Sequence, residues 1–381
     1  MPNSTQQGSA QPTVSPGLEG VVAFETEIAE PDRDGGALRY RGVDIEELAG
    51  RVSFGDVWAL LVDGGFGRGL RPAGDETLPA RNGDVRIDVQ SALATVAAKH
   101  GFAPLLDVDE EQARHQLALS SELALSYAAQ SARGDRSPVP ASELDKCSSV
   151  AERFLTCWRG EPDPAHVQAL DAYWVSAAEH GLNASTFTAR VIASTGADAA
   201  ASLSGAVGAM SGPLHGGAPA RVLPMIEEVE RRGDARAVVE SILDRGERLM
   251  GFGHRVYRAE DPRARVLRAT CKHLGSPRFE VACELEQAAL EVLAERRPDR
   301  QIATNVEFWA AVVLDFAQVP TAMMPAMFTC ARLAGWSAHI MEQKRTGRLV
   351  RPSARYVGPG ERKPSEVDGW DGVTPLAATV G

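Results

Sequence analysis

Two histidines in this chain stand among glycines, where an imidazole can meet a ligand. His215 belongs to the segment Ser211-Gly-Pro-Leu-His-Gly-Gly217, and His254 belongs to Gly251-Phe-Gly-His-Arg255. Glycine permits backbone angles that other residues resist and lets a ligand approach the main chain. We therefore expect both histidines at loops or helix ends, where an imidazole can donate or accept a proton near neutral pH.

An acid and a cation lie close to these histidines in sequence. Asn305-Val-Glu307 supplies a carboxylate and Asp261-Pro-Arg263 supplies a guanidinium. Two imidazoles, one acid and one arginine are the groups needed to remove a proton next to one carbonyl and to polarise another. A helix-capping histidine and a surface arginine are the structural alternatives. We expect no metal site, because no pattern such as His-Glu-x-x-His is present.

Together with other segments, these motifs resemble the citrate synthase family, including its 2-methylcitrate synthase branch. Any one motif would be weak alone, whereas several in the right order make chance similarity improbable. The further segments are Gly17-Leu-Glu-Gly-Val-Val22, Leu38-Arg-Tyr-Arg-Gly42, His180-Gly-Leu-Asn-Ala-Ser-Thr-Phe187, Ala334-Gly-Trp-Ser-Ala-His339 and Arg351-Pro352. The form that they resemble is the bacterial-type dimer.

The resemblance implies a mainly α protein with the citrate synthase fold. A large helical domain would face a smaller helical domain across a cleft that holds the active site. Carried over by motif, residues 17–218 and 312–381 would form a discontinuous large domain, and residues 219–311 the small one. Residues 1–16 are rich in Ser, Gln, Thr, Pro and Gly, and we expect them to be a disordered tail.

The resemblance also assigns catalytic roles to three residues. His215 would hydrogen-bond the thioester carbonyl of acetyl-CoA and stabilise the enol, while His254 would polarise the ketone of oxaloacetate. Glu307 would be the base that removes the methyl proton. The family usually has Asp there, and the extra methylene moves the carboxylate by about 1.5 Å, although a base must come within roughly 3 Å of its proton.

Substrate binding is implied for a second group of residues. A dicarboxylate needs planar donors that remain charged, which arginine provides. The resemblance places His180, Arg263, Arg332 and Arg351 around oxaloacetate, with Arg351 contributed by the other subunit of a homodimer, and places Gly251, Phe252 and Gly253 against CoA. The usual Asp-His-Glu around the binding histidine is Glu179-His180-Gly181 here. His339 we interpret as a packing residue.

The implied reaction joins acetyl-CoA, oxaloacetate and water to give citrate and CoA, through an enol and a citryl-CoA thioester. It is an acyl transfer that needs no metal or redox cofactor, with acetyl-CoA as a substrate. One alternative is 2-methylcitrate synthase, which uses propionyl-CoA, because one methylene in a pocket is worth only about 1 to 3 kcal/mol. Another is a non-catalytic dimeric paralogue that binds CoA or a dicarboxylate.

Composition narrows the class of protein. The 381 residues carry a formal net charge of -11, which argues against a nucleic-acid partner. The five cysteines show no paired spacing, so we expect reduced thiols rather than a disulfide frame or a zinc site. Neither a signal peptide nor a membrane-spanning apolar run is evident. These features favour a cytoplasmic location.

Apolar periodicity and capping residues predict a nearly all-helical chain. Strands are expected only at 18–28 and 38–40, on either side of a turn at 32–36. Helices are expected at 53–63, 84–102, 110–132, 141–158, 167–180, 183–193, 198–210, 220–230, 235–248, 279–297 and 325–344.

Overall fold

The computed structural model describes residues 14–32, 34, 36–71, 76–212, 215, 221–253 and 260–373. The chain divides into two compact units, one of residues 26–350 and one that combines residues 1–25 with 351–381. Within the described part of the second unit, the regular elements are the 3₁₀ helices η1 (Pro16–Leu18), η4 (Pro364–Glu366) and η5 (Trp370–Gly372). His254 lies outside the described residues.

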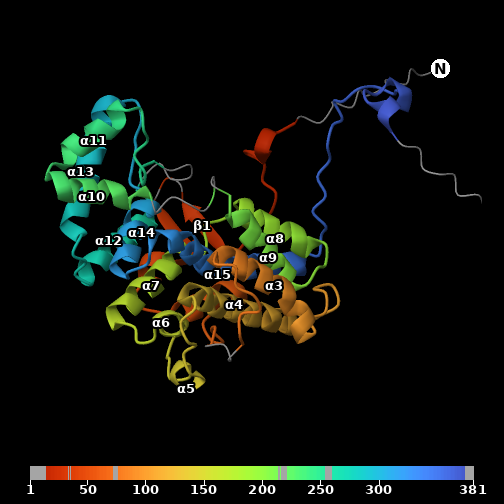
Figure 1. Ribbon diagram of the computed structural model, residues 1–381, viewed down its shortest axis with the longest axis horizontal. Coiled ribbons are helices and arrows are strands. Elements are labelled where there is room, and N and C mark those ends of the chain that lie inside the picture. The colour runs from red at the N-terminus through yellow and green to blue at the C-terminus, as the bar shows by residue number, and fades with distance from the viewer. Residues whose placement is uncertain are drawn as a thin grey trace, which may run out of the picture. The chain divides into compact units, whose positions relative to one another are not determined.

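The unit of residues 26–350 is built almost entirely of helices, as the sequence predicts (Figure 1). They are α1 (Ile45–Leu48), α2 (Phe54–Asp63), α3 (Val85–His100), α4 (Glu110–Arg133), α5 (Ala141–Leu144), α6 (Val150–Arg159), α7 (Pro164–Ala177), α8 (Ala184–Ser194), α9 (Ala199–Met210), α10 (Leu223–Arg232), α11 (Ala235–Asp244), α12 (Pro262–His273), α13 (Phe279–Arg296), α14 (Val306–Phe316) and α15 (Met324–Thr346), with a 3₁₀ turn, η3 (Thr321–Met323), before the last.

Helix α15 is the centre of this unit. It packs against α2, α4, α7, α8 and α9, and nearly all of its residues from Met324 to Met341 are buried. Gly335 allows the close approach of the turn after α7, because a Cβ there would lie 2.5 Å from the Ala178 carbonyl oxygen. The helix ends at Gly347, which adopts a left-handed conformation with φ of 62°.

A three-stranded antiparallel sheet in the order β1-β2-β3 supports one end of α7. Its strands are β1 (Ala29–Asp32), β2 (Ala37–Tyr40) and β3 (Val43–Asp44). Tyr40 is fully buried, and its hydroxyl contacts the carbonyl oxygens of Val175, Ser176 and Glu179 at 3.1 to 3.2 Å. This contact fixes the turn that leads from α7 to α8.

The strand predicted at 18–28 is wrong, while the one at 38–40 is confirmed. Pairing begins only where Ala29 meets Tyr40, and Val22 is 87% exposed. β-branched residues favour a strand only where a partner and a buried face are available. Among the described residues, 18–28 has no such partner.

Most helix predictions are confirmed, and their caps explain the boundaries. Ser53 and Asn183 cap α2 and α8 through their side chains. The helix expected at 141–158 is instead two, because Ser149 accepts a hydrogen bond from the Glu152 N–H and starts α6 anew. Helices α12 and α14 were not predicted; they begin directly after their capping residues Asp261 and Asn305, next to the candidates Arg263 and Glu307.

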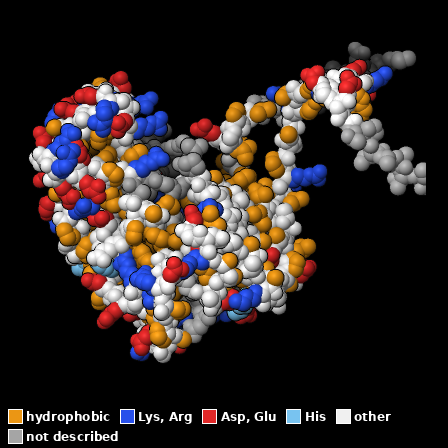
Figure 2. Space-filling view, in the orientation of Figure 1, with side chains coloured by type: hydrophobic (Ala, Val, Ile, Leu, Met, Phe, Trp, Pro, Cys, Tyr) orange, Lys and Arg blue, Asp and Glu red, His pale blue; other side chains and the backbone are white. Residues whose placement is uncertain are grey.

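Helices α10, α11 and α13 pack on one another, whereas α12 and α14 pack on each other and on α7. Figure 2 shows that Lys, Arg, Asp and Glu side chains crowd the surface of the first group, at the upper left. Exposed ion pairs such as Arg236–Glu295 and Arg296–Asp244 belong to it. The domain boundaries at 218 and 312 remain a prediction. None of the described helices is long and apolar enough to cross a membrane.

Candidate active site

A serine at the start of α8 contacts three polar side chains. Ser185 is fully buried, and its hydroxyl donates to Asn183 Oδ1 at 2.9 Å while it accepts from Trp336 Nε1 at 3.1 Å. The third contact is with His215, whose Nε2 lies 2.8 Å from Ser185 Oγ. Asn183 is itself fixed, because its Oδ1 also accepts from the Thr186 N–H at 3.1 Å. The candidate catalytic histidine is therefore tied to a capped helix end.

These contacts place a proton on His215. A hydroxyl has one hydrogen, an indole N–H only donates, and a carbonyl oxygen only accepts. Since the Ser185 hydrogen goes to Asn183, His215 Nε2 carries the hydrogen of its own contact with Ser185. Burial lowers the pKa of His215 below its ordinary value, and the charge of Arg332 lowers it further. The imidazole is thus neutral near neutral pH.

Asp261 and Arg263 form a buried ion pair at the start of α12. Arg263 donates from Nε to Asp261 Oδ1 at 3.0 Å and from Nη2 to Oδ2 at 2.8 Å. Asp261 Oδ2 also accepts from the Val306 N–H at 3.1 Å. One carboxylate therefore holds a candidate substrate-binding arginine and joins the first turns of α12 and α14.

Glu307 lies in the first turn of α14, next to that junction. Its N–H donates to Asn305 Oδ1 at 3.0 Å, but its carboxylate makes no hydrogen bond or ion pair with the described residues. Burial raises the pKa of Glu307 above its ordinary value, and the charge of Arg263 opposes the rise only in part. An acid without a partner and with a raised pKa has the properties of a general base that works near neutral pH.

The segment proposed to meet CoA lies beside the Asn305 motif. Phe252 pairs with Thr304 in an antiparallel bridge, and Asn305 Nδ2 donates to the Gly253 carbonyl oxygen at 2.8 Å. Gly251 has φ of 87°, and a Cβ there would lie 2.7 Å from that of Phe308. The packing against Phe308 and the positive φ therefore require glycine at 251, independently of any contact with CoA.

Arg332 approaches the same region from the middle of α15. It is 1% exposed, its Nε donates to the Ala177 carbonyl oxygen at 3.0 Å, and its guanidinium lies 4.8 Å from the centre of the Phe328 ring. Within the described residues, its two terminal nitrogens make no hydrogen bond. A planar fork with unused donors suits a carboxylate ligand.

The charged candidates lie within electrostatic reach of one another. Burial raises the pKa of Tyr173, on α7, while Arg332 and Arg263 oppose the rise and Glu307 adds to it. Burial likewise lowers the pKa of Arg332, to which Arg263 contributes. Charges on α12, α14 and α15 thus all influence buried Tyr173, and the charge of Arg332 also influences His215.

Two further residues that the sequence suggested for the site are His180 and Arg351. His180 is half-buried in the turn before α8, and exposed Arg351 belongs to the other compact unit. Sequence reasoning missed the roles of Ser185 and Asp261, which it treated only as part of a capping pattern and of a motif. The available signals were the position of Asp261 two residues before Arg263 and that of Ser185 five residues after His180. Within the described residues, no group of three His, Cys, Asp or Glu side chains is arranged to hold a metal ion.

Comparison with known proteins gives one consistent result. Residues 17–353 match the family model "Citrate synthase, C-terminal domain". The chain is 72% identical over 364 residues to "Putative citrate synthase 2" of Mycobacterium tuberculosis strain H37Rv, covering 95% of this chain and 98% of that protein. It is 32% identical over 375 residues to a 2-methylcitrate synthase of Shewanella oneidensis, covering 91% and 96%.

Solved structures agree with the sequence comparison. The ternary complex of carboxymethyl coenzyme A and oxaloacetate with citrate synthase from Thermoplasma acidophilum has a TM-score of 0.76 at 26% identity, and the match covers 92% of this chain and 98% of that one. Citrate synthase from Thermotoga maritima has a TM-score of 0.68 at 30% identity, covering 93% and 99%. These similarities confirm the fold predicted from the motifs.

Proposed function

The chain belongs to the citrate synthase family of condensing acyltransferases, and within it we propose that the protein is a citrate synthase. It condenses acetyl-CoA with oxaloacetate and hydrolyses the citryl-CoA thioester to citrate and CoA. The observation that supports this proposal is that Glu307, whose carboxylate has no partner among the described residues, is influenced by the charge of Arg263, and that His215, a neutral histidine, is influenced by the charge of buried Arg332. The Thermoplasma structure with oxaloacetate and a CoA analogue supports the choice of substrates.

In the first step Glu307 takes a methyl proton from acetyl-CoA, and the electron pair moves into the thioester carbonyl. His215 hydrogen-bonds that oxygen. To donate to that oxygen, His215 adopts its other neutral tautomer: it loses the proton on Nε2 and takes one up on Nδ1, and the Ser185 hydroxyl turns from Asn183 to donate to Nε2. Burial of the acid and the histidine strengthens both interactions, because charge is poorly screened away from water.

In the second step the enol carbon attacks the ketone carbon of oxaloacetate. His254 donates a proton to the alkoxide that forms, and water then cleaves the thioester to release CoA. His180, Arg263, Arg332 and Arg351 hold the two carboxylates. Gly251, Phe252 and Gly253 meet the CoA portion. No metal or redox cofactor takes part, since proton transfer and polarisation by these side chains account for each step.

The longer acid at 307 is accommodated by the start of α14. The turn is held from two sides, because Asn305 Oδ1 accepts from the Glu307 N–H and Asp261 Oδ2 accepts from the Val306 N–H. These contacts fix the backbone to which the carboxylate is attached. We propose that this backbone position offsets the extra methylene, so that Glu307 reaches the methyl proton.

We further propose a cytoplasmic homodimer in which Arg351 of one subunit completes the site of the other. Five unpaired cysteines among the described residues suit a reducing compartment. Residues 219–311 would form a small domain over a large one of residues 17–218 and 312–381. The packing of α10, α11 and α13 on one another supports a small domain in this part of the chain, while α12 and the start of α14, which fall within 219–311, pack on α7 of the large domain.

A second candidate function is 2-methylcitrate synthase, which the similarity to the Shewanella protein favours. Thiol release by purified protein, with oxaloacetate and either acetyl-CoA or propionyl-CoA, decides between the two. A higher kcat/KM with acetyl-CoA is the expected result, and a preference for propionyl-CoA would select the alternative. If neither thioester gives thiol release, the result would favour the alternative of a non-catalytic protein that binds CoA or a dicarboxylate.

A further inference from the structure

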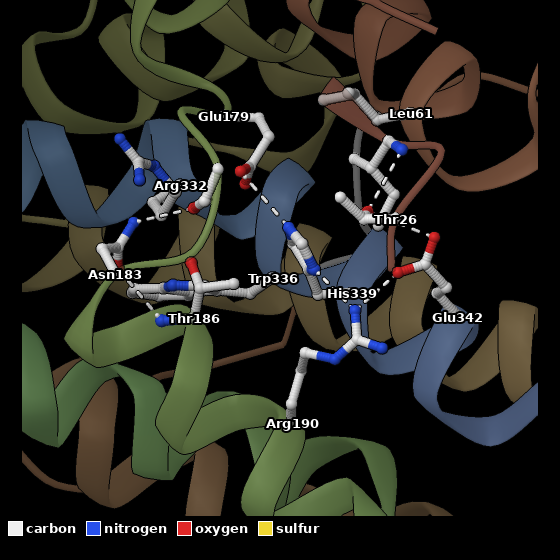
Figure 3. Close-up of polar contacts among 12 residues, drawn as sticks. Thr26, Leu61, Glu179, Asn183, Thr186, Arg190, Arg332, Trp336, His339 and Glu342 are labelled. Carbon is white, nitrogen blue, oxygen red and sulfur yellow. Dashed lines mark hydrogen bonds and ion pairs between the residues drawn. The ribbon is translucent and has the colours of Figure 1, made fainter. Parts of the chain in front are cut away.

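Four charged or polar side chains without a role in the proposed reaction form a line beside Arg332. Figure 3 shows Glu179, His339, Arg190 and Glu342 in that order. His339 Nε2 lies 3.3 Å from Glu179 Oε1, and Arg190 Nη1 lies 3.0 Å from His339 Nδ1. Arg190 also donates to Glu342 Oε2, at 2.5 Å. We call these four residues the buried line, because the side chains of Glu179, His339 and Arg190 are buried and only that of Glu342 is partly exposed.

The proton position on His339 follows from its contact with Arg190. A guanidinium only donates, so His339 Nδ1 accepts and Nε2 carries the hydrogen. The imidazole is therefore neutral, and it turns an N–H toward Glu179. The buried line then carries two negative charges and one positive charge, and its positive charge, on Arg190, is matched by Glu342.

Glu179 is left without an equally direct partner. It is 0% exposed, and neither carboxylate oxygen makes an aligned hydrogen bond within the described residues. The separation of 3.3 Å from His339 marks an electrostatic contact instead. A carboxylate removed from water is costly unless a nearby charge compensates it.

The compensating charge lies on the same helix as His339. Arg332, Gly335 and His339 recur at spacings of three and four, so they share one face of α15. Gly335 makes room for the acid, because a Cβ there would lie 2.1 Å from Glu179 Oε2. This face of α15 therefore carries the cation of Arg332 and the N–H donor of His339. Between them, the missing side chain of Gly335 leaves the space that the Glu179 carboxylate occupies.

Charge pairing among the buried arginines points the same way. Arg263 has Asp261 and Arg190 has Glu342 as a directly bonded carboxylate. Arg332, by contrast, contacts the Ala177 carbonyl oxygen and the Phe328 ring. Burial lowers the pKa of Arg332, and the charge of Glu179 is the leading influence that opposes the change.

The effect on Glu179 is reciprocal. Burial alone would raise the pKa of Glu179, but its electrostatic and hydrogen-bonding contact with His339, then the charge of Arg332 and the backbone N–H of His180, bring the pKa below its ordinary value. The carboxylate is therefore ionised near neutral pH. It stabilises the charge on Arg332, and Arg332 stabilises the charge on Glu179, without a direct hydrogen bond between them among the described residues.

We propose that Glu179, oriented by His339, is the internal counter-ion of Arg332 and weakens the binding of the dicarboxylate substrate. The inference rests on the proposed function, in which Arg332 holds a carboxylate of oxaloacetate. In the empty site Glu179 stabilises the buried guanidinium. Once a dianion binds, the same negative charge repels it, so the acid limits affinity and favours release of a tricarboxylate product.

The substitution Glu179→Gln tests the proposal, because it keeps the shape and removes the charge. The dissociation constant of oxaloacetate, measured by calorimetry, should fall by about tenfold, the effect of one charge several ångströms away in a partly screened site. The Tm of the ligand-free protein should fall as well. Glu179→Asp keeps the charge and should leave the affinity near that of the wild type. Weaker binding of oxaloacetate by a folded Glu179→Gln protein would overturn the proposal.

Glu342→Gln is the matched control, since it makes the same chemical change at the far end of the buried line. Glu342 is already paired with Arg190 and accepts from the Glu27 N–H at 3.0 Å. Its substitution should lower the Tm without tightening oxaloacetate binding. Equal tightening in both variants would reject Glu179 as the specific counter-ion of Arg332.

A stability cycle tests the pairing without any activity. If Glu179 compensates Arg332, the double variant Glu179→Gln, Arg332→Gln should unfold at a higher temperature than Glu179→Gln alone. This comparison holds even if Glu179→Gln does not fold by itself, because recovery of folding in the double variant supports the pairing. Absence of any recovery rejects it. The cycle does not depend on thiol release, so its failure is distinguishable from failure of the proposed reaction.

Discussion

Ser185 Oγ lies 2.8 Å from Nε2 of His215, a residue thirty positions away in the chain. The serine is itself held by Asn183 and Trp336, so it fixes the orientation of the imidazole, and the direction of its own hydroxyl selects the tautomer. A histidine that contacts a reacting carbonyl depends on both properties, since each tautomer presents a different atom to the substrate.

Ser185→Ala should therefore lower kcat by about three- to tenfold, the value of one hydrogen bond of roughly 1 kcal/mol. Steady-state thiol release measures the effect. Thr186→Val is the control, because the neighbouring hydroxyl Thr186 Oγ1 is buried and has no hydrogen-bond partner among the described residues. A Ser185→Ala protein as fast as the control would separate Ser185 from the work of His215.

His215→Ala and His254→Ala should each reduce kcat far more than they weaken oxaloacetate binding. Both histidines are proposed to act on charge that develops as the carbon–carbon bond forms, so their contacts are strongest in the transition state. Turnover and calorimetric binding of oxaloacetate in each variant provide the comparison. Near-wild-type turnover in both proteins would contradict the assignment.

How far the sequence predicted this site depends on the kind of interaction. Glycine-flanked histidines and motif arginines are local patterns, so the sequence indicates His215, Arg263, Arg332 and Glu307 directly as candidates. The contact of Ser185 with Trp336 joins α8 to α15 across 151 positions, and nothing in either segment alone predicts that distance. His339 was interpreted as a packing residue for the same reason, because its partners Glu179 and Arg190 come from other elements.

The fold shows the same division. Helix caps such as Ser53 and Asn183 act within three residues, and the sequence located them correctly. The strand at 18–28 failed because strand formation depends on a partner, which the chain provides only from Ala29 onward. The start of α6 was missed because Ser149 breaks an otherwise helical pattern by capping locally. Local chemistry was predictable, whereas pairing across the chain was not.

Glu307→Gln should nearly abolish turnover, because the amide keeps the shape but accepts no proton, and a placed base is worth roughly 10²- to 10⁴-fold. Glu307→Asp distinguishes two accounts of the longer side chain. If the start of α14 has adapted to Glu, the shorter acid is withdrawn from the methyl group and kcat falls, which is the result we expect. A higher kcat in the Asp variant would show that Glu is a misfit, and full activity of the Gln variant would remove Glu307 from the mechanism.

The raised pKa of Glu307 predicts the pH dependence of both activity and stability. Only the carboxylate accepts a proton, so kcat/KM should rise with pH along an acid limb above the ordinary glutamate value of about 4.3. The folded protein holds this proton to higher pH than the unfolded chain, so the stabilisation is complete below about 4.3 and is lost as pH rises through the folded pKa. Urea unfolding across this range should show the loss in the wild type but not in Glu307→Gln. If the acid limb of kcat/KM in the wild type fell at the ordinary glutamate pKa, the prediction would be contradicted.

The last prediction concerns Arg351, which belongs to a different compact unit from the other candidates. If it completes the site of the partner subunit, protein with Arg351→Ala and protein with His215→Ala should each be nearly inactive alone. A heterodimer of the two contains one site with both residues intact and one site with neither. Mixing after mild dissociation should therefore restore thiol release, in proportion to the heterodimer measured by native mass spectrometry with one subunit tagged. Mixing two preparations of the same variant is the control and should restore nothing. If heterodimers form and activity does not return, Arg351 acts within its own subunit or has no part in the site.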